Sequence, residues 1–167
     1  MGEVQLMTRY AARDEFVRHW LPHVTDAGLL HLISLLEQAS PLLIHGQFLA
    51  TFPQGCLASQ IAWHHPRTAS LEPEDAGVVW LTKVAGLNPA TSILLTWWDQ
   101  KGLADRELCH LLLEACYQEC ARRQLVPAGS RKMASNSEDC SSSVAPVSGT
   151  DSASTCDSVP RNNSFQD

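Results

Sequence analysis

The chain has 167 residues, a formal net charge of −6 and 44% hydrophobic residues, enough to build the core of one domain. The negative charge and the lack of a basic cluster argue against a nucleic-acid-binding protein and against a polybasic membrane anchor. After position 126, Ser, Asn, Gly, Pro and Asp dominate, and Phe165 is the only aromatic residue. We therefore predict a helical domain over residues 1–126 and a disordered tail over residues 127–167.

Two helices are predicted in the N-terminal part of the chain. Apolar residues recur at helical spacing over residues 8–21, and Pro22 ends or kinks this first helix. Asp26 is then an N-cap for a second helix that reaches about Gln38. This second helix is apolar over a wide arc, which predicts a central position in the bundle. It should stop before Pro41, because proline disfavours helical geometry in the residue that precedes it.

Residues 42–52 have no clear periodicity. The segment is short, lies between two prolines and contains His45 and Gly46, so it fits an extended segment, a small hairpin or a bent helix. We favour irregular or extended structure. A short helix is predicted to follow over residues 54–63 and to stop before Pro66.

Three more helices are predicted, over residues 72–85, 89–101 and 105–124. Gly86 and Gly102 each follow a helix at the position that favours a left-handed residue. Asn88 and Asp105 are suitable N-caps, and Pro89 suits the first helical position, where its missing N–H costs nothing. The sequence therefore predicts an all-α fold, a single bundle of about five or six helices.

Trp97 and Trp98 are adjacent in the predicted helix over residues 89–101. Adjacent side chains on a helix point about 100° apart, so both cannot easily face one core. One tryptophan should therefore be substantially more exposed than the other, and tryptophan is over-represented at binding hot spots. We predict that Trp97 and Trp98 contribute to a partner-binding surface. The alternative is a small bundle that simply covers both side chains.

The last predicted helix carries three thiols on its apolar face. Counting about 100° per residue, Cys109, Leu112, Leu113, Cys116 and Cys120 fall on one side. Cys109 and Cys116 lie about 10 Å apart along the axis, too far to share one zinc ion. Cys116 and Cys120 could share an ion only if further ligands came from elsewhere. We predict that the three thiols pack as small apolar groups.

Cys56 and two histidines are the basis of an alternative hypothesis, a metal- or thiol-dependent protein. Cys56 lies at the N-terminus of the helix predicted over residues 54–63, where the pKa of a thiol can be lowered, and His64 and His65 follow at the far end of that helix. His64 lies about 12 Å away in helical rise and cannot hydrogen-bond the thiol directly. A zinc site that combines these residues with Cys116 or Cys120 is conceivable, but no Cys/His pair repeats at a spacing typical of zinc motifs.

The function predicted from the sequence is a non-enzymatic interaction or adaptor module that binds another protein. No nucleotide-binding, serine-hydrolase or calcium-binding motif is present, and we predict no cofactor, no metal and no nucleic-acid partner. The longest stretch without charged residues, 38–66, is broken by prolines, glycines and histidines, so we predict no membrane span. The N-terminus lacks the apolar run of a secretory signal, which favours the cytoplasm and reduced thiols.

Overall fold

The computed structural model describes residues 2–126 and, from Thr8 onward, their side chains. Regular structure over residues 2–126 is helical apart from two isolated β-bridges, as the sequence predicted. The chain forms α1 (Gly2–Glu15), α2 (Asp26–Glu37), α3 (Leu57–Ala62), α4 (Pro73–Val79), α5 (Ile93–Lys101) and α6 (Arg106–Arg122). The tail predicted to be disordered, residues 127–167, lies outside the described residues.

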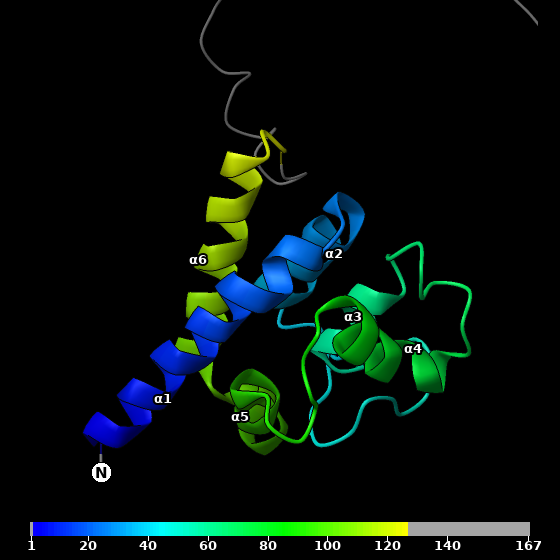
Figure 1. Ribbon diagram of the computed structural model, residues 1–167. Helices are drawn as coiled ribbons and strands as arrows, with labels where there is room; N and C mark the ends of the chain where they lie inside the picture. The colour runs from blue at the N-terminus through cyan, green and yellow to red at the C-terminus, as the bar shows by residue number, and fades with distance from the viewer. Residues whose placement is uncertain (1, 127–167) are drawn as a thin grey trace, which may run out of the picture. The chain divides into compact units, whose positions relative to one another are not determined.

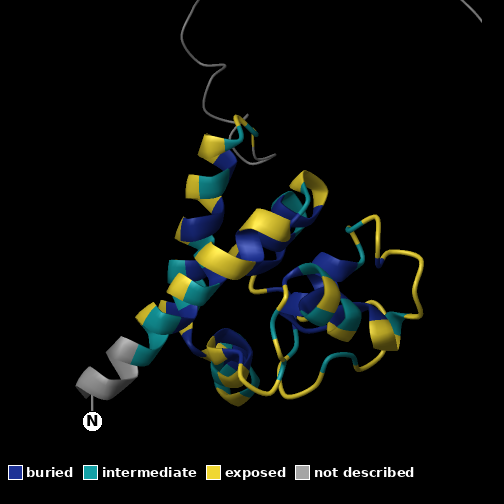
Figure 2. Ribbon diagram, in the orientation of Figure 1, coloured by how far each residue is buried: buried dark blue, intermediate teal, exposed yellow. Residues whose placement is uncertain are grey.

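The six α-helices enclose a single core (Figure 1). α1 packs against α5 and α6, α2 packs against α3 and α6, and α3 packs against α4. Figure 2 shows that buried residues face inward on these helices, while exposed residues follow their outer faces. α2 buries six of its residues in the core, and like α1, α3 and α6 it contacts two other helices. No helix in the described part of the chain is long and apolar enough to cross a membrane.

Two of the helices continue into π-helical turns, and a tryptophan lies at the end of the first turn and at the start of the second. α1 is followed by a π turn at Phe16–Trp20 and a 3-10 turn at Leu21–His23, and α4 is followed by a π turn at Trp80–Val84. The rings of Trp20 and Trp80 pack with their centroids 5.5 Å apart. A π turn holds more residues than an α turn, so it shifts the side chains that follow. The sequence predicted helix in both places, without this change in geometry.

Two predicted N-caps are corrected by the structure. Thr25, not Asp26, caps α2, and its Oγ1 accepts a hydrogen bond from the amide of Gly28 at 3.1 Å. Ser92, not Asn88, caps α5, so the helix starts later than predicted. Both caps are hydroxyl residues in extended geometry directly before the first helical residue, which is the conformation that a cap requires. The side chain of Asn88 instead closes a turn ahead of α5.

Other predicted caps agree with the structure, whereas the first helix starts at Gly2, earlier than the predicted residue 8. Asp105 caps α6, and its carboxylate accepts a hydrogen bond from the amide of Leu108 at 3.2 Å. Gly86 and Gly102 have left-handed φ values of 68° and 48°. α2 ends at Glu37 with Gln38 as its C-cap, close to the predicted end. Ala39 then takes a left-handed φ of 45°, which closes the C-terminal turn of the helix ahead of Pro41.

The segment over residues 42–52 is irregular, as the sequence analysis favoured. Leu43 and Leu49 each form one bridge with Gly55, the first parallel and the second antiparallel. The segment therefore wraps around Gly55 and does not pair with itself as a hairpin. A Cβ atom on Gly55 would lie 2.8 Å from the Cβ of Ser59, so a larger residue does not fit there. α3 starts only after this crossing, later than predicted.

Candidate functional site

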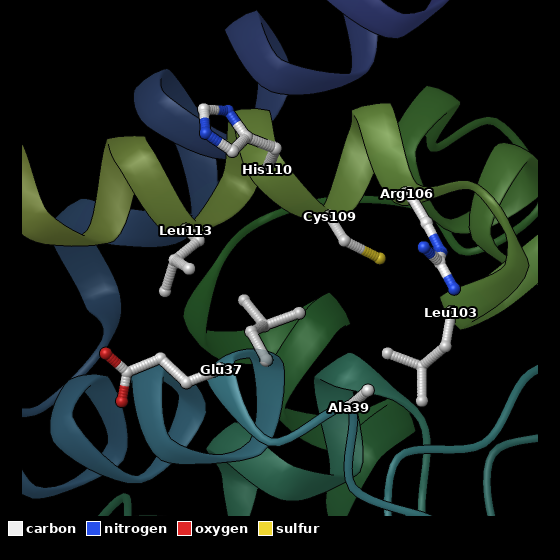
Figure 3. A pocket seen from close by; sticks show the side chains of 8 residues that line it. Glu37, Ala39, Leu103, Arg106, Cys109, His110 and Leu113 are labelled. Carbon is white, nitrogen blue, oxygen red and sulfur yellow. The ribbon is translucent and has the colours of Figure 1, made fainter.

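A groove lies between the C-terminal end of α2 and the N-terminal half of α6 (Figure 3). Its volume is about 360 Å³. Apolar side chains and one cysteine form most of its surface, and charged or polar side chains lie at its edge. The residues that line it are Leu36, Glu37, Ala39, Leu103, Arg106, Cys109, His110 and Leu113.

α6 provides one continuous wall of the groove. Arg106, Cys109, His110 and Leu113 follow the spacing i, i+3, i+4 and i+7, so they lie on one face of the helix. The opposite wall is short, because the left-handed conformation of Ala39 ends α2 and turns the chain away. The groove is therefore the place where α6 extends past the end of its neighbour.

The groove continues along α6 into a second hollow of about 260 Å³. His110 and Leu113 line both spaces. Tyr117 lines the second hollow and donates a hydrogen bond from its hydroxyl to Glu37 on α2. This bond raises the pKa of Tyr117 to about 12, so the hydroxyl keeps its proton and remains a donor at neutral pH. The bond ties the two walls together at the Glu37 end of the groove.

Opposite charges lie at opposite ends of the groove. Figure 3 shows Arg106 beside Leu103 at one end, and Glu37 across from Leu113 at the other. The carboxylate of Glu37 is engaged by Tyr117. The side chain of Arg106 is exposed and has no hydrogen bond or ion pair with any side chain that the structure describes. The Arg106 end of the groove therefore presents an exposed guanidinium that no described side chain engages.

The thiol of Cys109 points into the groove (Figure 3). Burial, and then the nearby carboxylate of Asp105, raise the pKa of this thiol to about 11. Its one polar contact is weak, with Sγ lying 3.9 Å from the carbonyl oxygen of Gly102. The thiol is therefore neutral at pH 7, and a neutral thiol is a poor nucleophile. Cys109 contributes soft apolar surface to the groove.

The buried face of α6 is rotated from the predicted one. Leu108 and Ala115, which the prediction left out, are buried together with Cys116 and Cys120. Cys109, which the prediction placed at the centre of the apolar face, is only half-buried at its edge. The reason is that α2 ends beside Cys109 and leaves that edge uncovered.

Sequence reasoning missed the charged and polar members of the groove. Arg106 and His110 were not singled out, although their i, i+4 spacing places the two on one side of α6. Leu103 belongs to the 3-10 turn Gly102–Ala104, whose position against α2 has no local signal in the sequence.

Cys56 occupies the N-cap position of α3, as the alternative hypothesis requires, but its side chain is fully buried. Burial raises the pKa of the Cys56 thiol, and its Sγ lies 3.8 Å from the hydroxyl of Ser59. The imidazole of His64 packs against that of His31, with ring centroids 4.5 Å apart. No group of three or more His, Cys, Asp or Glu residues suited to a metal ion occurs within residues 2–126. Nothing in the geometry of Cys56 therefore favours thiol or metal chemistry.

The two tryptophans of α5 differ in exposure, as predicted. Trp98 is fully buried, and its Nε1 donates a hydrogen bond to the carbonyl oxygen of Ile44 at 2.7 Å. Trp97 is half-buried, and its Nε1 donates to Asp105 at 2.7 Å. The ammonium group of Lys101 lies 5.2 Å from the centre of the Trp97 ring. Of the two, only Trp97 keeps surface that a partner could reach, and the partner-binding role of the pair stays a prediction.

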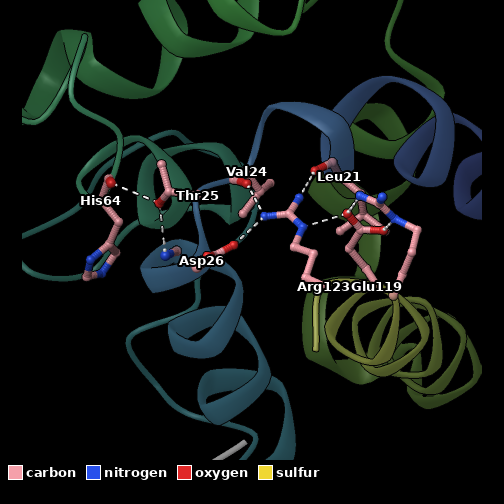
Figure 4. A network of polar contacts seen from close by, with 9 residues as sticks. Leu21, Val24, Thr25, Asp26, His64, Glu119 and Arg123 are labelled. Carbon is pink, nitrogen blue, oxygen red and sulfur yellow. Dashed lines mark hydrogen bonds and ion pairs between the residues drawn. The ribbon is translucent and has the colours of Figure 1, made fainter. Parts of the chain in front are cut away.

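Arg123 fixes the far end of α6 against the segment that leads into α2 (Figure 4). Its guanidinium donates to the carbonyl oxygens of Leu21 at 2.7 Å and Val24 at 2.8 Å. It also pairs with Asp26 at 2.9 Å and with Glu119 at 2.6 Å. Arg123 therefore holds α6 and the start of α2 together, and so helps to set the relative position of the two groove walls.

No protein-family model, curated protein or solved structure matches this chain. The groove combines open apolar surface with one guanidinium that no described side chain engages, and its thiol is held neutral.

Proposed function

We propose that the helical domain over residues 1–126 is a non-enzymatic interaction module that binds another protein through the groove between α2 and α6. The observation that carries the proposal is the groove itself, in which Leu36, Leu103 and Leu113 line a space that stays open between two helices. Burial of apolar surface favours association by roughly 25 cal/mol per Å². A groove of this kind is a recurring way in which helical domains take up a segment of a partner.

Trp97 is a second contact point in this proposal. It is half-buried on α5 and carries the cation of Lys101 on its ring, so it offers an amphipathic surface. Trp98 would act indirectly, because its buried side chain holds α5 to the core.

The cytoplasm is the compartment that we propose for this module. The four cysteines in the described part of the chain, Cys56, Cys109, Cys116 and Cys120, are free thiols. Free thiols persist most readily in a reducing compartment, whereas secreted domains of small size commonly form disulfides. The thiols therefore support a cytoplasmic location.

Selection from a displayed peptide library tests the proposed function. The full-length protein is the target, and peptides that bind it are counter-selected against the Leu113→Glu variant. We expect peptides that bind the wild-type protein and lose most of their affinity for Leu113→Glu, because the substitution places a charge in the apolar part of the groove.

Leu71→Glu is the matched control for this selection. Leu71 is 38% exposed and does not line the groove, so the same substitution there should leave peptide binding unchanged. Circular dichroism of both variants shows whether the helical fold is kept. If no selected peptide distinguishes Leu113→Glu from Leu71→Glu, the groove is not an interaction site and the proposal is wrong.

A further inference from the structure

We infer that the groove between α2 and α6 receives an amphipathic helix of the partner, and that this helix carries an acidic side chain where it meets Arg106. The inference rests on the proposed function, because it names the chemistry of the partner that the same groove binds. In this arrangement the apolar ridge of the incoming helix lies on Leu36, Cys109 and Leu113.

The shape of the groove selects a helix. One wall is a face of α6 and the other is the end of α2 with Ala39, so a ridge of side chains on another helix can pack along α6 beside the end of α2. An extended segment would need an exposed sheet edge, but the described residues offer only isolated bridges at Leu43, Leu49 and Gly55. A proline-rich segment needs a groove lined by large aromatic rings, and no Trp, Tyr or Phe lines this one.

The charges at the groove select an acidic side chain at one end. Arg106 follows Asp105 and precedes Glu107 in the sequence, yet both carboxylates are engaged elsewhere. They bind Arg9, at 3.0 Å and 2.6 Å. His110, one turn further along α6, adds no negative charge to the groove wall. The exposed guanidinium of Arg106 therefore matches a carboxylate on the partner, and a lysine in the same place would be repelled.

The opposite end of the groove fixes the direction of the partner helix. Glu37 provides the only carboxylate among the residues that line the groove, and Tyr117 already donates to it. A second acidic side chain is unfavourable beside Glu37. The acidic end of the partner ridge therefore lies at Arg106, and its neutral or basic end lies at Glu37.

Two synthetic peptides of about 15 residues, long enough to form a helix, test this inference. Both carry leucines at positions i, i+3, i+4 and i+7, and they differ only in having Glu or Lys beside one end of this ridge. Their affinities for the full-length protein are measured by isothermal titration calorimetry. We expect the Glu peptide to bind about three- to tenfold more tightly, the range of one exposed ion pair together with the repulsion that it replaces.

Charge reversal provides the decisive comparison. Arg106→Glu should reverse the order of the two peptides, so that the Lys peptide binds more tightly. Arg67→Glu makes the same change in charge at an exposed arginine that does not line the groove, and it should leave the preference for the Glu peptide unchanged.

Alkylation of Cys109 locates the bound peptide without any substitution. The raised pKa of the Cys109 thiol makes its reaction with iodoacetamide slow. Because the thiol faces the groove, the bound Glu peptide should lower this reaction rate further. Peptide mapping by mass spectrometry separates Cys109 from Cys140 and Cys156, which lie outside the described residues. Peptide binding that leaves the alkylation rate of Cys109 unchanged would place the peptide elsewhere and overturn the inference.

The remaining outcomes separate this inference from the proposed function. If the two peptides bind with equal affinity and protect Cys109, the inferred acidic side chain on the partner is wrong. The proposal that the groove is an interaction site is then kept. If neither peptide binds, the inference is wrong. The display selection alone then decides whether the groove is an interaction site. A dimer in sedimentation equilibrium that dissociates on Leu113→Glu identifies a second copy of the chain as the occupant, and also overturns the inference.

Discussion

Arg9 on α1 and Asp105 at the start of α6 form a partly buried ion pair. Nε of Arg9 donates to both carboxylate oxygens of Asp105, at 3.1 and 3.0 Å. The side chain of Asp105 is only 1% exposed. The same carboxylate accepts a hydrogen bond from the indole of Trp97 and caps α6 through the amide of Leu108. One carboxylate therefore links α1, α5 and α6.

Asp105→Ala should destabilise the protein by about 3–5 kcal/mol, because it leaves the Arg9 guanidinium and the Trp97 indole without their shared acceptor. The free energy of unfolding is measured by chemical denaturation. Glu107→Ala is the matched control, since Glu107 also binds Arg9 but is 51% exposed, and its loss should cost less than about 1 kcal/mol. Equal losses for the two variants would contradict the linking role of Asp105.

Stability should also fall at acidic pH through Asp105. Burial raises the pKa of this carboxyl, but hydrogen bonds from Arg9 and Trp97 lower it more, so its pKa lies below the ordinary value. A carboxyl with a lowered folded pKa stabilises the folded state above its unfolded pKa of about 3.9. This contribution is lost as the pH falls through the lower, folded pKa. We expect Asp105→Asn to show a smaller decrease in unfolding free energy below about pH 4 than the wild-type protein.

The two tryptophans of α5 should differ in their contribution to stability. Trp98→Ala removes a fully buried side chain and should cost about 3–5 kcal/mol. Trp97→Phe keeps an aromatic ring but removes the hydrogen bond to Asp105, and should cost about 1 kcal/mol. Thermal and chemical denaturation of both variants measure the difference. Similar losses would show that Trp97 is as much a core residue as Trp98 and would weaken its proposed role as a contact point.

His64, which packs on His31 of α2, and its neighbour His65 should make the free energy of unfolding depend on pH near neutrality. Partial desolvation, and then the neighbouring His31, lower the pKa of His64, although the residue is exposed, and partial desolvation lowers the pKa of His65. A histidine with a lowered folded pKa stabilises the folded state above its unfolded pKa of about 6.5, and this contribution is lost as the pH falls below that value. The unfolding free energy should therefore decrease from about pH 7 to pH 5. His64→Gln should reduce this slope, and His110→Gln, on the exposed side of α6, is the control.

Ala39→Gly, unlike the preceding substitutions, should increase the free energy of unfolding. Its left-handed φ of 45° is unfavourable for a residue with a Cβ atom, by about 1–2 kcal/mol, and glycine avoids this cost. After the greater chain entropy of glycine is subtracted, Ala39→Gly should stabilise the protein by about 0.5–1 kcal/mol. Ala27→Gly, at an exposed helical position of the same helix, should instead destabilise it. A lower melting temperature for Ala39→Gly would contradict the assignment of strain to this position.

Local signals in the sequence were sufficient for the helices and for several of their ends. Helical spacing of apolar residues depends only on neighbours along the chain, so the all-α fold follows from it. Asp105 as a cap, and left-handed glycines at Gly86 and Gly102, are also decided within a few residues. Neighbouring residues alone did not decide which of two cap candidates is used. Ser92 caps α5 instead of Asn88, and the hydroxyl of Ser92 also donates a hydrogen bond to Glu15 on α1, far away in the sequence.

The groove was decided only by tertiary structure. The sequence showed that Cys109 and Leu113 lie on an apolar face of the last helix, and from this it predicted that they are core residues. Whether an apolar face is covered depends on where a distant helix ends, and α2 ends at Glu37, too early to cover this part of α6. The free guanidinium of Arg106 also depends on a distant contact, because Arg9, far away in the sequence, binds the adjacent carboxylates. Contacts between segments distant in the chain set both features, and such contacts leave no periodic signal in one sequence.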